Sequence, residues 1–124
     1  MKFFLLVFGI FLSVQLTAQM SADDKIDEVY RPEFFDNNPE LRQAFQILLN
    51  ERIRYTRTPM GRNEKYTLLS TCNLNNKDNP SLTRDAAFNE LTFNPLKYHM
   101  IFFSKTTQVY RFDGTDFLII IAPQ

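Results

Sequence analysis

The run Phe117–Ile121 constrains the fold of this chain most, because every residue in it is apolar. A strand with one face in water alternates apolar and polar residues, whereas a strand covered on both faces is apolar throughout. The run is short for a helix, and its isoleucines favour strands. We therefore predict that it forms an interior strand of a sheet, with a neighbouring strand on each side.

The neighbours of this strand are predicted from the residues around it. Two more strands are expected at Tyr98–Phe103 and Thr107–Phe112, and the last strand then extends over Thr115–Ala122. The connections are short, so these three strands should form an antiparallel meander. Residues Tyr66–Leu74 alternate with a period of two and are expected to pair with the free side of the last strand. This order leaves Tyr98–Phe103 at an edge of the sheet.

The dipeptide Asp113-Gly114 lies between the last two predicted strands. In hairpins, Asp-Gly favours a two-residue type I′ turn, and the turn type fixes the register of the flanking strands. The predicted register places Arg111 opposite Asp116.

Helices are predicted before the sheet. Ser21-Ala22-Asp23-Asp24 has the form of a capping box, and the helix that follows should stop before Pro32. A longer apolar stripe, with Asn38 as the expected N-cap, predicts a helix over Pro39–Tyr55. Thr83–Phe93 suits either a short helix or a strand, and we favour the helix. The predicted fold is therefore α+β, with N-terminal helices packed on a four-stranded, mainly antiparallel sheet that ends in a three-strand meander.

The first eighteen residues are expected to be a cleavable signal peptide. Lys2 provides a positive charge, and the apolar run Phe3–Leu12 is too short to span a bilayer. Ala18 offers a processing site, so cleavage is predicted after it, with no transmembrane anchor afterwards. The remaining residues, 19–124, have the length of a single small domain.

Composition excludes some function classes. Without Lys2, the chain holds thirteen basic and fourteen acidic residues, a net charge of −1. A protein that binds nucleic acid through phosphate contacts usually carries a basic excess, so we expect no nucleic-acid partner. Cys72 is the only cysteine, so no disulfide can form within the chain. No zinc-ligand spacing, calcium loop or phosphate-binding glycine loop occurs, and we predict neither a metal nor a cofactor.

The exported part of the chain resembles small uncharacterised secreted proteins of the Bacteroidota. The resemblance rests on the Ala18-Gln19 junction and on Asn94-Pro95-Leu96-Lys97-Tyr98 before aromatic hairpins. It implies a compartment, periplasmic or extracellular, and brings no catalytic residue with it.

Two hypotheses for function follow. The first is a non-catalytic exported module that binds a protein or another component of the cell envelope, and its oligomeric state stays open. Its candidate binding residues are a basic block and an aromatic residue at the predicted sheet edge: Arg52, Arg54, Arg57, Arg62, Lys65 and Phe103. Strand addition at that edge is the expected mode of binding. The alternative is a small exported hydrolase or ligand-binding enzyme that uses His99 with Tyr66 or Tyr98.

Overall fold

The computed structural model describes residues 19–60 and 65–124, so the predicted signal peptide and Arg62 lie outside the described residues. The helices are α2 (Ala22–Val29) and α3 (Pro39–Ile47). The strands are β1 (Ile53–Arg57), β2 (Thr67–Leu68), β3 (Gln108–Arg111) and β4 (Phe117–Ile121). A π-helical turn covers Leu48–Arg52, and short 3-10 turns cover Pro32–Phe35, Leu69–Thr71 and Pro95–Lys97. The predicted α+β class is confirmed.

The sheet in the described part of the chain has the strand order β1-β4-β3-β2. Both β1 and β3 are antiparallel to β4, whereas β2 is parallel to β3. The prediction that Phe117–Ile121 is an interior strand is confirmed, and Ile119 and Ile121 are fully buried. A four-stranded, mainly antiparallel sheet is likewise as predicted.

One neighbour of β4 differs from the prediction. The helix expected over Pro39–Tyr55 ends early: α3 stops at Ile47, the π-helical turn follows, and Ile53–Arg57 is β1. Residues 53–56 include isoleucine, tyrosine and threonine, which favour strands, and they pair with the apolar β4. The predicted strand Tyr66–Leu74 is wrong in length and partner. Only Thr67–Leu68 is a strand, and it pairs with β3, because the chain turns at Leu69 to bury that side chain.

The predicted meander is a two-strand hairpin, since Tyr98–Phe103 is not a strand. Tyr98 makes a single bridge with Leu74. The N–H of His99 donates to the Asn73 carbonyl beside this bridge. Beyond it, the N–H of Met100 donates to the Tyr98 carbonyl and that of Ile101 to the Tyr110 hydroxyl, each at 2.9 Å. A strand needs these groups for its ladder, so this segment offers no sheet edge.

The predicted hairpin register is wrong. Arg111 lies opposite Leu118, and the N–H of Phe112 donates to the Phe117 carbonyl at 3.1 Å, which leaves four residues in the loop. A type I′ turn needs a positive φ at both central residues, but only Gly114 has one, at 71°. The carboxylate of Asp113 instead accepts hydrogen bonds from the Ser70 N–H, at 2.9 Å, and from its hydroxyl, at 2.5 Å.

The helix favoured over Thr83–Phe93 is absent from the described chain. The carbonyl of Asn89 accepts from the N–H of both Thr92 and Phe93, which makes a tight turn. This turn directs Phe88 and Phe93 together, with ring centroids 5.1 Å apart. The packing of these rings, rather than helical propensity, therefore determines the backbone conformation of this segment.

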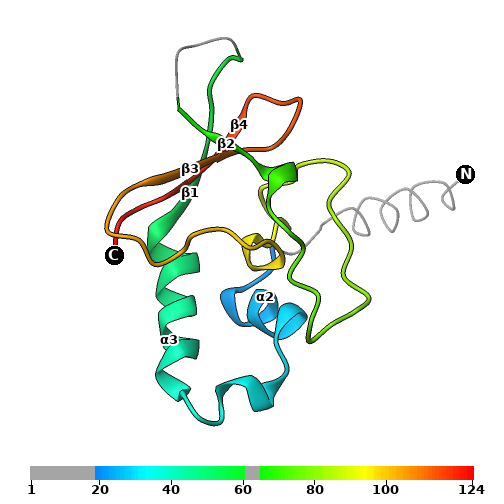
Figure 1. Cartoon of the computed structure of the whole chain (residues 1–124), viewed down its shortest axis with the longest axis vertical. Helices are drawn as coiled ribbons and strands as arrows, with labels where there is room; N and C mark the ends of the chain where they lie inside the picture. Colours follow the sequence, from blue (N-terminus) through cyan, green and yellow to red (C-terminus); the bar gives the residue numbers. More distant parts are fainter. Residues whose placement is uncertain (1–18, 61–64) are drawn as a thin grey trace, which may run out of the picture.

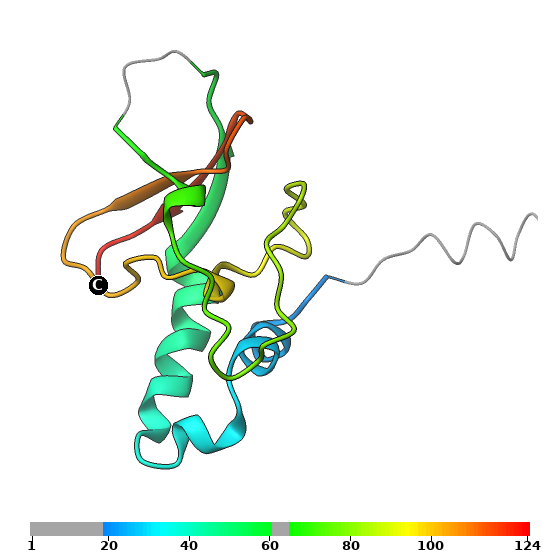
Figure 2. The ribbon, with the colours of Figure 1, turned by 45° about the vertical axis from the view of Figure 1, so that its right-hand side comes forward.

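The helices and the sheet share one apolar core. Figure 1 shows α3 running away from the sheet at its junction with β1, with α2 beside it, and Figure 2 shows the same arrangement from another side. The capping box of α2 is confirmed. Asn38 precedes α3 as predicted, but its side chain caps no N–H. Buried residues of both helices join the cluster that holds β4, among them Ile26, Val29 and Phe45.

Candidate functional site

The free edge of β1 is the candidate site. Hydrogen bonds at both ends of the strand define its orientation: the Ala122 N–H donates to the Arg52 carbonyl at 2.8 Å, and the Thr58 N–H to the Asp116 carbonyl at 2.7 Å. Residues in an antiparallel strand alternate between bonding to the neighbour and pointing away from it. Residues 54 and 56 therefore bond to β4, while Ile53, Tyr55 and Arg57 direct their backbone groups outward.

Most of these outward groups are unpaired within the described chain. The Ile53 N–H donates to the Leu48 carbonyl at the end of the π-helical turn, whereas the Ile53 carbonyl and the outward groups of Tyr55 and Arg57 have no partner among the described residues. An edge strand with unpaired N–H and C=O groups is a template for another strand. In β1 the template is five residues long, whereas β2, at the other edge, has only two.

Two exposed arginines flank this edge. Arg54 and Arg57 are both exposed, and neither forms an ion pair with a described residue. Side chains alternate along a strand, so residues 54 and 57 project from opposite faces of the sheet. The Arg57 guanidinium lies 5.0 Å from the centre of the Phe117 ring. A strand added at this edge would therefore meet a positive charge on each face.

Arg52, which the sequence places in the same basic block, has a structural role. Its guanidinium donates to the carbonyls of Phe102, at 2.7 Å, and Ala122, at 2.9 Å. It also lies 5.5 Å from the centre of the Phe103 ring. Arg52 thus ties the segment before β3 to the end of β4, and its charge is directed into the molecule.

Replacement of Arg52 with methionine should lower the free energy of unfolding by about 2 kcal/mol, because two carbonyls lose a charged donor. Replacement of Arg54 with methionine is the matched control and should change it by less than about 0.5 kcal/mol, as expected at an exposed site. Chemical denaturation of both variants provides the measurement. Equal effects of the two substitutions would contradict the distinction between these arginines.

The other predicted binding residues lie apart from the β1 edge. Phe103 is partly exposed, and its ring centre lies 5.8 Å from that of Phe45 on α3. Lys65 is exposed and precedes β2. Arg62 lies outside the described residues. The structure therefore places Arg54 and Arg57 along β1, with Arg52 and Phe103 together at a different position.

The residues of the alternative hypothesis are not brought together. His99 is exposed and makes no side-chain hydrogen bond with the described residues. The Tyr98 hydroxyl donates to the Asp85 carboxylate at 2.6 Å, whereas the Tyr66 ring centre lies 4.5 Å from the Arg111 guanidinium carbon. These two tyrosines therefore have separate partners, and neither orients His99.

A polar cluster surrounds Tyr98 in a hollow of about 210 Å³. Its hydroxyl also accepts from the Asp85 N–H at 2.9 Å, and Lys97 donates to the same carboxylate at 3.3 Å. Burial, together with the hydrogen bond to Asp85, raises the pKa of Tyr98 to about 12. Arg84 donates to the carbonyls of Leu69 and Cys72. These contacts hold the 84–86 segment against the chain around β2 and keep the tyrosine protonated.

Cys72 is buried, and burial raises the pKa of its thiol. Residues 19–60 and 65–124 contain no grouping of His, Cys, Asp and Glu side chains that could hold a metal ion. Across the same residues, no helix is long and apolar enough to cross a membrane.

Sequence reasoning missed the backbone of β1, because residues 53–55 were assigned to the end of a helix. A signal was available: Ile53, Tyr55 and Thr56 all favour strands, and they follow directly on the apolar helical stripe.

Comparison with known proteins finds no matching family model, no matching curated protein and no matching solved structure.

Proposed function

We propose that this chain is a non-catalytic exported module, periplasmic or extracellular, that binds an extended segment of another protein along the free edge of β1. The observation that carries the proposal is the set of unpaired outward backbone groups in β1, which are those of Tyr55 and Arg57 and the Ile53 carbonyl. Strand addition uses such groups for affinity and the flanking side chains for specificity. The apolar N-terminal run and Ala18 support export.

Charge complementarity favours an acidic partner. Arg54 and Arg57 are exposed on opposite faces of the edge, and no described carboxylate pairs with them. Acidic side chains on an added strand would pair with both arginines, whereas a second copy of β1 would bring like charges near one another. The proposed ligand is therefore an extended segment rich in Asp or Glu rather than another copy of this chain.

Reversing both charges, in the double variant Arg54→Glu and Arg57→Glu, should abolish capture of the partner from envelope extracts. Repulsion replaces attraction at two positions of the edge, while both side chains are exposed and the fold should persist. Capture is measured by pull-down with quantitative mass spectrometry. A double variant at the exposed residues Lys77 and Lys105, each changed to Glu, has the same change in net charge and should capture the partner as well as the wild type does.

Capture should also weaken as salt is raised, because exposed charge pairs are screened. Recovery of the same proteins by the Arg54 and Arg57 variant and by the lysine control would contradict the proposed site.

A further inference from the structure

A cavity of about 500 Å³ lies where α2 begins, away from the β1 edge. It is lined by residues at the start of α2 and by residues near the end of α3 and in the π-helical turn, among them Gln46, Leu49 and Asn50. This volume is within the range of small-molecule sites in proteins. Most of its lining side chains are polar, so its contents would be polar as well.

Lys25 lines this cavity, and most of its surface is covered by the protein. Only 7% of the residue is exposed, and its ammonium makes no hydrogen bond or ion pair with a described residue. A helical side chain points back toward the helix N-terminus, which directs Lys25 toward the first turn of α2. Burial lowers the pKa of this ammonium. An ammonium at the wall of such a cavity, with no carboxylate of a described residue paired to it, attracts an anion.

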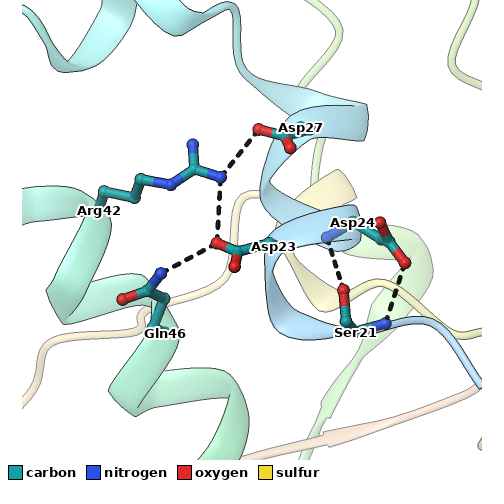
Figure 3. A network of polar contacts seen from close by, with 6 residues as sticks. All are labelled: Ser21, Asp23, Asp24, Asp27, Arg42 and Gln46. Atoms are coloured by element: carbon teal, nitrogen blue, oxygen red, sulfur yellow. Dashed lines mark hydrogen bonds and ion pairs between the residues drawn. The ribbon is translucent and has the colours of Figure 1, made fainter.

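The first turn of α2 adds two more donors to the same cavity. The capping box occupies the N–H groups of Ser21 and Asp24, as Figure 3 shows. The N–H groups of Ala22 and Asp23 make no hydrogen bond with described residues. Free N–H groups at a helix N-terminus and the helix dipole both favour an anion.

The neighbouring carboxylates are already occupied, which limits the charge that the cavity can accept. One oxygen of Asp23 accepts from Arg42, at 3.0 Å, and from Gln46, at 2.9 Å (Figure 3). Asp24 accepts from the Ser21 N–H at 3.3 Å. These acidic groups would repel a dianion such as phosphate more strongly than a monoanion, and the cavity is larger than an inorganic ion needs.

We propose that this cavity binds a small organic molecule through its carboxylate, which is held by the Lys25 ammonium and by the free N–H groups of Ala22 and Asp23. The rest of the ligand would lie against polar side chains, including that of Asn50. The proposal is independent of strand addition at β1, because the two sites share no residue.

The test uses protein expressed from the full-length reading frame and three probes: N-acetylglycine, its neutral amide N-acetylglycinamide, and inorganic phosphate. In NMR titrations, N-acetylglycine should shift amide signals of residues 19–25 and 46–50 in a saturable way. It should also raise the pKa of Lys25, followed at the side-chain Cε. The neutral amide should produce neither change, and phosphate should bind more weakly than N-acetylglycine.

The variant Lys25→Met should bind N-acetylglycine at least about tenfold more weakly, as expected when one charged hydrogen bond is lost. Lys105→Met, at an exposed lysine elsewhere, is the control and should bind like the wild type. Removal of this ammonium, which no described residue pairs, should not unfold the protein, and the amide spectrum of the variant checks this. Equal binding of the amide probe, tighter binding of phosphate, or unchanged binding by Lys25→Met would overturn the proposal.

Discussion

Replacement of Phe93 with alanine should lower the free energy of unfolding by about 3–5 kcal/mol, the usual cost of removing a buried phenylalanine ring. Phe93 is 1% exposed. Its ring centre lies 5.9 Å from that of Tyr55, 5.8 Å from that of Tyr98 and 6.4 Å from that of Phe112. Phe88 is also close, at 5.1 Å between ring centres. The Phe93 side chain therefore joins β1, Tyr98 and the hairpin, and its loss leaves a cavity among four other rings.

The control for this prediction is Phe34→Ala, because Phe34 is 44% exposed and loses much less buried surface. Urea denaturation of both variants gives the free energies. A cost at Phe93 no larger than the cost at Phe34 would show that the aromatic cluster does not support β1.

Replacement of Asn94 with alanine should lower the free energy of unfolding by about 2–4 kcal/mol, because buried hydrogen-bonding groups would lose their partners. The Asn94 amide donates to the Lys25 carbonyl at 2.8 Å and to the Glu28 carboxylate at 2.9 Å. Its oxygen accepts from the Leu96 N–H at 3.1 Å. Asn94 thus connects α2 to the chain that leads toward β3, and it is 1% exposed.

Asn89→Ala is the matched control, since Asn89 is exposed and its side chain accepts only from the Leu91 N–H and lies within its own turn. Thermal unfolding followed by circular dichroism should separate the two variants. A large loss at Asn89 with none at Asn94 would contradict the role assigned to this link.

Local signals in the sequence predicted the elements whose causes are also local. The capping box at Ser21 needs only residues three apart, and the all-apolar run of β4 carries its burial in its own composition. Both predictions are confirmed. The class of the fold follows from such signals. The number of strands agrees with the prediction only because β1, which was not predicted, replaces the predicted strand Tyr98–Phe103.

Other features depend on contacts between distant residues, and the sequence does not display them. Asp113 in the hairpin loop accepts hydrogen bonds from Ser70, which is far from it in the chain. Arg52 and Arg54 have the same side chain, but only Arg52 meets the carbonyls of Phe102 and Ala122. The candidate edge is masked in the sequence by helical periodicity that continues to Ile53, although Ile53, Tyr55 and Thr56 favour strands.

Lys25 was also missed, although a signal was present. It lies four residues before Val29, so a helix places both on one face, and Val29 is buried. A lysine at such a position is usually assumed to extend into solvent. Its burial follows from the way α2 packs against the rest of the core, which no local pattern shows.

Hydrogen exchange at single amides of β1 tests the central claim most directly. In the free protein, the amides of Arg54 and Thr56 should exchange slowly because they bond to β4, and those of Tyr55 and Arg57 should exchange faster. Addition of the partner captured through Arg54 and Arg57 should slow exchange at residues 55 and 57. Binding of that partner with no added protection at these two amides would contradict strand addition at β1.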